Sequence, residues 1–226
     1  MNFYENKITG KQYLKILSNF DKNISNKFLL QNIAMFCGNK SFYRILKCEE
    51  LIKKTSKVKG DIIEFGIWNG NNLFSLKKIL DYLKLKKKII GYDNFSGFPN
   101  PTKNKKSGKY VGNKKLIKYI IKFFKFKNIQ IIDDDIYNLE NYKKKIGKIS
   151  FVYIDCDIYG PVKTILNTLN KKISKGGIIA FDEGNRGINK GEKKALNEFY
   201  KKNKKQYRRI FLKKNYQPDV ILEKTR

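Results

Sequence analysis

Two short apolar segments that each end abruptly in acidic residues constrain the fold of this chain more than any other feature. They span residues 148–154 and 176–181. The first runs into Asp155 and Asp157, the second into Asp182 and Glu183, and both are rich in β-branched and aromatic residues, as in strands buried on both faces of a parallel sheet. The residues between them repeat apolar side chains at helical spacing, so we predict a β-α-β unit. A right-handed crossover would bring the four carboxylates to the ligand-binding edge of an open α/β sheet, which indicates a metal, a general base, or both.

A glycine-rich turn forms the second informative stretch. A strand predicted at 61–65 carries Glu64 and is followed by Gly66 and Gly70, after which apolar residues recur at helical spacing. Glycines at such a turn let the backbone approach a ligand closely, and the helix that follows offers free N–H groups. The spacing is not the G-x-G-x-x-G dinucleotide fingerprint, and taken alone this turn is equally an ordinary strand-turn-helix.

Acidic residues also close two further predicted strands. Asp93 follows the apolar run 88–92, where it could accept hydrogen bonds from the ribose hydroxyls of a nucleoside. Three acids at 133–135 follow the run 128–132. They suit either a contact with adenine or a solvated turn.

Length and composition limit the class of protein. A chain of 226 residues fits one domain, and we divide it into an N-terminal helical segment at 1–57 and a main domain at 58–226. No apolar run approaches the ~20 residues of a membrane span, and the N-terminus lacks a signal-peptide pattern, so we expect a cytoplasmic protein. The three cysteines show no C-x-x-C spacing, which indicates neither a disulfide framework nor a zinc site.

The net charge of +30 favours affinity for phosphate, in nucleic acid, anionic membrane or a phosphorylated small molecule. An AT-rich genome would produce the same excess of lysine without any such function. An RNA-binding protein or RNA methyltransferase is therefore the alternative function. Because RRM, KH and C₂H₂ signatures are absent, we do not expect a nucleic-acid partner.

Taken together, these motifs resemble a class I S-adenosylmethionine-dependent methyltransferase. The segments 63–70, 93–99, 153–159 and 175–183 are similar to motifs of the macrocin O-methyltransferase family. The resemblance covers about residues 58–205. It implies a Rossmann-like α/β fold, with a mostly parallel seven-stranded sheet whose last strand is antiparallel.

The resemblance also implies the ligands. S-adenosylmethionine would be the cofactor, and the acceptor would be a sugar hydroxyl on a nucleotide sugar or a glycan, as in polysaccharide biosynthesis. The implied cofactor-binding residues are Glu64, Gly66, Trp68 and Gly70 at the methionine and ribose end, Asp93 at the ribose hydroxyls, and Asp134 or Asp135 near the adenine. The sequence does not determine the oligomeric state, and a homodimer is one of the alternatives.

Metal and base residues follow from the same resemblance. Asp155, Asp182 and Glu183 match positions that hold a divalent metal in metal-dependent members, and oxygen ligands suit Mg²⁺ or Mn²⁺. The Asp-Glu pair departs from the more familiar Asp-Asp, and the chain contains no histidine to act as a base. Of the two catalytic candidates, Asp155 and Asp157, the latter is our first choice as base, since a metal ligand is less free to take a proton. A helix N-cap is the alternative role for Asp157.

Overall fold

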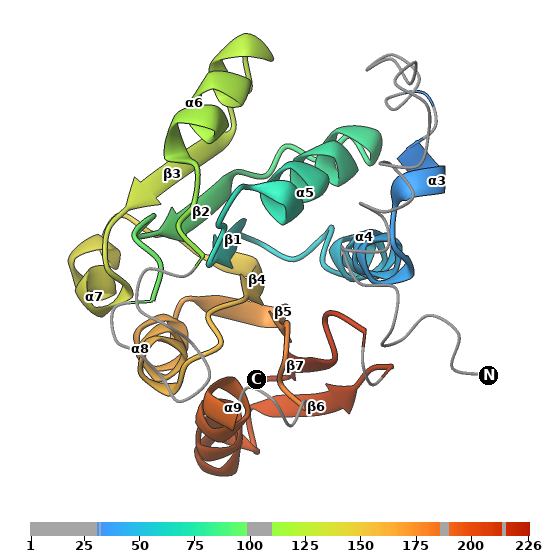
Figure 1. The fold of residues 1–226 in the computed structure, drawn as a ribbon. Helices are drawn as coiled ribbons and strands as arrows, with labels where there is room; N and C mark the ends of the chain where they lie inside the picture. The colour runs from blue at the N-terminus through green and yellow to red at the C-terminus, as the bar shows by residue number, and fades with distance from the viewer. Residues whose placement is uncertain (1–30, 32, 99–109, 186–189, 214–215) are drawn as a thin grey trace.

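A seven-stranded sheet organises the protein (Figure 1). The computed structural model describes residues 31, 33–98, 110–185, 190–213 and 216–226. The strand order is β3-β2-β1-β4-β5-β7-β6. The strands are β1 (Asp61–Phe65), β2 (Ile89–Asp93), β3 (Ile129–Asp133), β4 (Ile149–Ile154), β5 (Ile173–Phe181), β6 (Tyr207–Phe211) and β7 (Val220–Lys224). Strands β1 to β5 pair in parallel, whereas β7 is antiparallel to both β5 and β6. This confirms the predicted mostly parallel sheet with an antiparallel last strand.

Helices cover both faces of the sheet, giving three layers (Figure 1). They are α3 (Ile33–Phe36), α4 (Asn39–Lys54), α5 (Asn71–Tyr82), α6 (Lys114–Phe123), the 3₁₀ turn η1 (Ile136–Asn138), α7 (Leu139–Tyr142), α8 (Tyr159–Leu169) and α9 (Lys190–Asn203). Helices α4, α5 and α6 contribute to the core on one face, and α7, α8 and α9 to the core on the other. Alternate strand residues therefore point into different cores, which is the period of two expected for a sheet buried on both sides.

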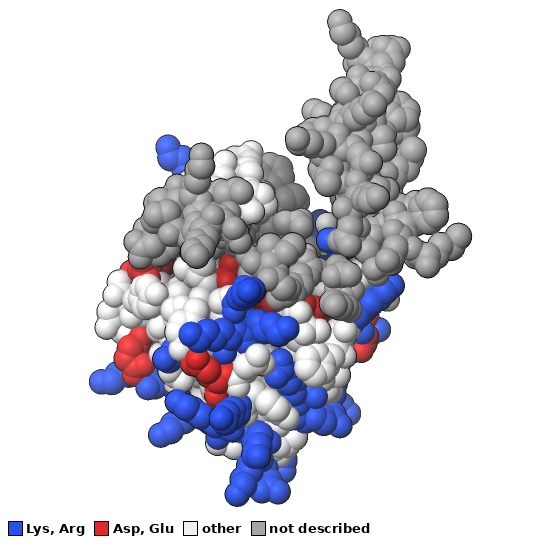
Figure 2. Space-filling model, turned by 60° about the horizontal axis from the view of Figure 1, so that its bottom comes forward, with Lys and Arg blue, Asp and Glu red and all other residues white. Residues whose placement is uncertain are grey.

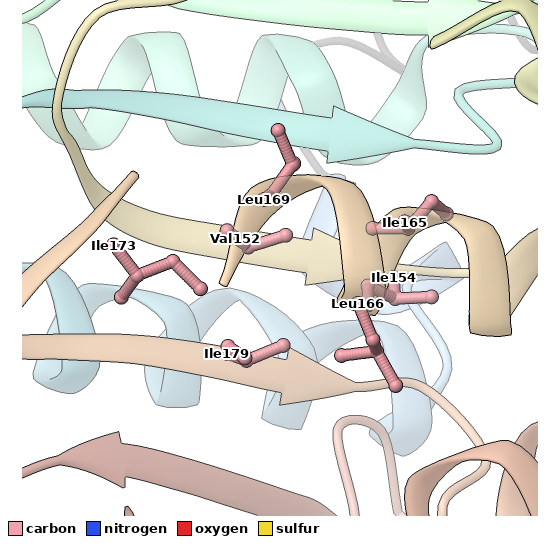
Figure 3. Close-up of a pocket in the computed structure, with 7 residues that line it drawn as sticks. All are labelled: Val152, Ile154, Ile165, Leu166, Leu169, Ile173 and Ile179. Atoms are coloured by element: carbon pink, nitrogen blue, oxygen red, sulfur yellow. The ribbon is translucent and has the colours of Figure 1, made fainter. Parts of the chain in front are cut away.

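The predicted β-α-β unit is present. All six residues of β4 are buried, and β4 pairs directly with β5. Helix α8 turns its apolar stripe onto these two strands, and the contact is lined only by aliphatic side chains (Figure 3). These are Val152, Ile154, Ile165, Leu166, Leu169, Ile173 and Ile179. Because no polar group lines it, this region belongs to the core and is not a candidate ligand site.

The N-terminal helices contribute to the same fold. Cys48, Leu51 and Ile52 of α4 are buried in the core shared with α5. The sequence also predicts short helices at 13–17 and 28–36 and a polar loop at 100–113 that would close as a lid over the ligand. The first helix, part of the second and most of the loop lie outside the described residues. The division at residue 57 stays a prediction.

The hydropathy of the described helices and the distribution of surface charge both bear on possible partners. Within the described ranges, no helix combines the length and the apolar character that crossing a membrane requires. Figure 2 shows lysine and arginine side chains spread among acidic and uncharged residues on the face that includes α9 and the β6–β7 pair. The charge on this face does not form a single continuous stripe.

Candidate active site

The carboxyl ends of β1, β4 and β5 bring acidic residues together. Hydrogen bonding continues one residue past each strand, because the N–H of Asp155 donates to Phe65 O at 3.0 Å and the N–H of Asp182 donates to Ile154 O at 2.9 Å. Asp155 and Asp182 therefore lie level on neighbouring strands. By alternation they share a sheet face with Glu64 and Tyr153, the face covered by α4 and α5.

Arg44 of α4 reaches this cluster. Its Nη2 lies 3.1 Å from Asp182 Oδ1, and the same oxygen accepts a hydrogen bond from the Tyr153 hydroxyl at 2.6 Å. The Gln217 side-chain amide donates to Asp182 Oδ2 and in turn accepts from Arg44. Asp182 is only 2% exposed, so its charge is compensated by these contacts and not by water.

Burial and the opposite charges of buried and half-buried side chains determine the pKa values in the cluster. Burial raises the pKa of Asp155 well above its ordinary value, Asp182 raises it further, and Arg44 opposes both. Burial lowers the pKa of the Arg44 guanidinium, but Tyr153, Asp182 and Asp155 raise it more, so the net shift is upward. The Arg44 charge is thus firmly held beside the acids.

The predicted metal ligands do not fit a divalent cation as they are arranged. Both carboxylate oxygens of Asp182 are already engaged by Tyr153, Gln217 and Arg44. Among the described residues, no group of three or more His, Cys, Asp or Glu side chains is placed to hold a metal ion. The expectation of Mg²⁺ or Mn²⁺ at Asp155, Asp182 and Glu183 therefore gains no support from the geometry.

The glycine turn lies at the same edge. Gly66 and Gly70 adopt left-handed φ values of 79° and 82°, and Gly70 is the N-cap of α5. A Cβ on Gly66 would lie 2.0 Å from Asp155 O, so glycine is required by the close approach of two strand ends. Asp93 ties the turn to β2 by accepting hydrogen bonds from Trp68 N–H and Phe95 N–H, each at 2.8 Å.

Unsatisfied buried polar atoms concentrate around this edge. Five side-chain atoms of the described residues are buried without a hydrogen-bond partner, and four of them belong to residues of this region. They are Arg44 Nε, Glu64 Oε2, Asn72 Nδ2 and Glu192 Oε2. Burial raises the pKa of Glu64 to about 8, although the neighbouring Asn72 amide and the Arg44 charge oppose this shift. Because native proteins rarely leave such atoms unpaired, their grouping indicates a site that a polar ligand completes.

Asp134 and Asp135 both have local structural partners. Asp134 accepts hydrogen bonds from the Tyr142 hydroxyl and the Asn138 amide, each at 2.8 Å. Asp135 caps η1 by accepting the Tyr137 N–H at 2.9 Å. They shape the segment after β3, and an adenine contact by either residue stays a prediction.

The alternative role suggested for Asp157 is wrong. The N-cap of α8 is Ile158, with no side-chain cap hydrogen bond, and Asp157 itself has a left-handed φ of 61°. Its role as a base stays a prediction, as do the cofactor roles of Glu64, Gly66, Trp68, Gly70 and Asp93, which the structure does bring to one edge.

Sequence reasoning missed Arg44 and Glu192. Arg44 carries one available signal, because this lysine-rich chain has only five arginines among its 50 Lys and Arg residues. Arginine forms a rigid fork that lysine cannot replace, so a rare arginine in such a composition marks a geometric need. Glu192, in the first turn of α9, is fully buried, and its Oε1 accepts the N–H of Glu183 at 2.8 Å.

Comparisons with known proteins agree with this fold. The chain is similar in structure to the calicheamicin methyltransferase CalS11, with a TM-score of 0.77 at 20% sequence identity, covering 95% of this chain and 90% of that chain. It is also similar to the O-methyltransferase NovP, with a TM-score of 0.65 at 18% identity, covering 84% of this chain and 82% of that chain. At these identities the likeness shows the fold.

The family follows from the sequence. A search of curated proteins found no match. The family model described as macrocin-O-methyltransferase (TylF) matches residues 30–210, which is most of the chain. The chain therefore belongs to the macrocin-O-methyltransferase (TylF) family and is a class I S-adenosylmethionine-dependent O-methyltransferase.

Proposed function

We propose that this enzyme methylates a sugar hydroxyl, on a nucleotide sugar or a glycan. The observation that carries the proposal is the group of unpaired buried polar atoms beside the glycine turn, in a chain of this family. Support for a sugar acceptor comes from CalS11, which is described as a TDP-rhamnose 3'-O-methyltransferase.

The residues present fit S-adenosylmethionine. Its sulfonium supplies an electrophilic methyl group, and its amino acid end carries an ammonium and a carboxylate. The unpaired Oε2 of Glu64 suits the ammonium, and the unpaired Nε of Arg44 suits the carboxylate. Asp93 holds the turn by accepting the N–H groups of Trp68 and Phe95, and a carboxylate at this position suits ribose hydroxyls.

Proton removal from the acceptor falls to a carboxylate in this proposal. A sugar hydroxyl must lose its proton as it attacks, and Asp157 remains the first candidate base. Asp155 is the weaker candidate, because burial and Asp182 raise its pKa and favour its protonated form. A protonated Asp155 can instead donate a hydrogen bond that orients the acceptor.

Charge compensation in this proposal comes from Arg44 and not from a divalent cation. Arg44 lies on the face of the sheet where the acids converge, and Asp182 has no free oxygen to offer a metal. No step here depends on Mg²⁺ or Mn²⁺.

Binding and transfer assays test the proposal separately. Calorimetry should show S-adenosylmethionine binding, and radiolabelled methyl transfer to a panel of nucleotide sugars and glycans should identify the acceptor. Asp93→Asn should weaken cofactor binding about tenfold, the loss of one charge-assisted hydrogen bond. Asp133→Asn is the matched control, since Asp133 pairs with Asp93 in the β2–β3 register but contacts Lys114. Tight binding of NAD without S-adenosylmethionine binding would overturn the assignment.

The alternative of an RNA methyltransferase predicts a different acceptor. A salt-dependent gel shift with random RNA, followed by methyl transfer to that RNA and not to any sugar, would establish it. The charge spread over the face shown in Figure 2 does not favour this alternative.

A further inference from the structure

The outer face of α6 carries two parallel stripes of unlike character. Leu116, Tyr119 and Phe123 recur at spacings of three and four residues, and all are exposed. The lysines 115, 118 and 122 follow the same spacing one residue earlier and are also exposed. Residues three and four apart lie on one side of a helix, so an apolar stripe runs beside a cationic one. Figure 1 shows α6 projecting at the end of the sheet beyond β3.

The apolar stripe extends into a continuous group of aromatic rings. Tyr119 and Phe123 are each 63% exposed and Phe124 is 59% exposed. Ring centroids of Tyr119 and Phe123 lie 5.9 Å apart, those of Phe123 and Phe124 5.1 Å, and those of Phe124 and Phe126 5.5 Å. Contiguous exposed aromatic groups of this kind mark interaction sites in soluble proteins.

The charge of this segment favours an anionic partner. Residues 114–127 contain six lysines and no acid. Lys114 is paired with Asp133, and the other five are exposed. A helix that places aromatic and aliphatic side chains beside lysines suits the boundary between the phosphates and the acyl chains of an anionic lipid surface.

Two other partners fit the same residues less well. In a two-fold contact between copies of this chain, the lysine stripe would face itself, and like charges would oppose association. Single-stranded nucleic acid needs free ring faces along a groove. Here Tyr119 stacks on Phe123 at an interplanar angle of 28°, and Phe124 stacks on Phe126 at 17°, so these rings already face one another.

We propose that α6 docks this enzyme on an anionic membrane surface, with the ring group at the acyl boundary and the lysines on headgroup phosphates. The helix is joined to the candidate site, because the N–H of its N-cap residue Asn113 donates to Asn69 Oδ1 at 2.9 Å and Ile117 packs against Gly70. Docking through α6 would thus hold the glycine turn close to the lipid. The proposal rests on the surface of α6 and is independent of the acceptor.

Flotation of the full chain with vesicles tests it. Binding should be strong to phosphatidylcholine vesicles containing phosphatidylglycerol and at least tenfold weaker to phosphatidylcholine alone. The double variant Tyr119→Ser/Phe123→Ser should lose at least tenfold in binding to the anionic vesicles, and Lys118→Glu/Lys122→Glu should do the same. Cofactor binding by both variants shows that they are folded.

Matched controls separate α6 from the overall positive charge. Phe211→Ser removes a ring that is 57% exposed on β6, and Lys201→Glu/Lys202→Glu reverses two exposed charges on α9. Both should bind anionic vesicles within twofold of the wild type. Equal losses in the controls and the α6 variants, or no vesicle binding at all, would overturn the proposal. Two other results would also overturn the proposal. One is a dimer that the Tyr119→Ser/Phe123→Ser variant abolishes, and the other is RNA binding that displaces the vesicles and that the same variant abolishes.

Discussion

Replacing Arg44 by methionine tests the charge balance of the acid cluster most directly. The substitution keeps the volume of the side chain but removes the cation that lies 3.1 Å from Asp182. The two side chains are 19% and 2% exposed, so water cannot take over the role of Arg44. Removing one partner of a buried ion pair costs about 3–5 kcal/mol, and we expect the free energy of unfolding to fall by that amount at pH 8.

The pH dependence of this loss has a defined sign. Burial and Asp182 already raise the pKa of Asp155, and without Arg44 it would rise further. A carboxyl with a raised folded-state pKa makes folding less favourable as pH rises from its unfolded value through its folded value. The deficit of Arg44→Met should therefore be smaller below the folded-state pKa of Asp155 and grow as the pH rises through it.

Urea unfolding followed by circular dichroism measures both effects. Arg208→Met is the control, because Arg208 is 61% exposed and pairs with Glu223, so its loss should cost at most about 1 kcal/mol. Adding Asp182→Asn to Arg44→Met should recover part of the stability, since the uncompensated charge disappears. If Arg44→Met costs no more than Arg208→Met, with no dependence on pH, the reasoning fails.

Three further predictions concern the metal, the cofactor and the glycine turn. Chelation with EDTA should leave turnover within about twofold, because Arg44 compensates the acids; loss restored by Mg²⁺ would reinstate the metal site. Affinity for S-adenosylmethionine should rise from pH 6 to pH 8. Burial raises the pKa of Glu64 to about 8, and binding of the cofactor's ammonium favours the ionised form of this carboxyl. Calorimetry should therefore detect proton release on binding, and Glu64→Gln should abolish that release. Gly66→Ala should destabilise the fold by about 2 kcal/mol or more in urea unfolding, because its Cβ would meet Asp155 O at 2.0 Å, whereas Gly147→Ala, with nothing within 4 Å, should be tolerated.

The fold was largely predictable because its signals are local. Apolar runs that end in acids gave the strands, and the spacing of Val162, Ile165, Leu166 and Leu169 gave the helix between β4 and β5, as observed. Local patterns also located the carboxyl edge. They could not distinguish a ligand contact from a structural role, as Asp135 shows by capping η1.

The candidate site was less predictable because its partners come from distant segments. Arg44 and Gln217, which contact Asp182, lie near opposite ends of the chain. No spacing in the sequence connects them, and only the packing of α4 on the sheet brings Arg44 into reach. The sequence therefore located the cluster of acids correctly, but it did not predict that an arginine, Arg44, would balance their charge.

The loop that follows β5 shows how distant segments determine the chemistry of this cluster. Its first residue, Asp182, accepts a hydrogen bond from the Gln217 side-chain amide. The N–H of Glu183 donates to Glu192 of α9. The N–H of Asn185 donates to both carboxylate oxygens of Asp219 at 3.1 Å. Burial raises the pKa of Glu192 well above its ordinary value, and Asp182 adds to this effect, so Glu192 favours its neutral form. A neutral Glu192 can hold the backbone of this loop without adding a further charge beside Asp182. The acids can therefore share a single arginine, which is why we place the charge compensation of this enzyme on Arg44.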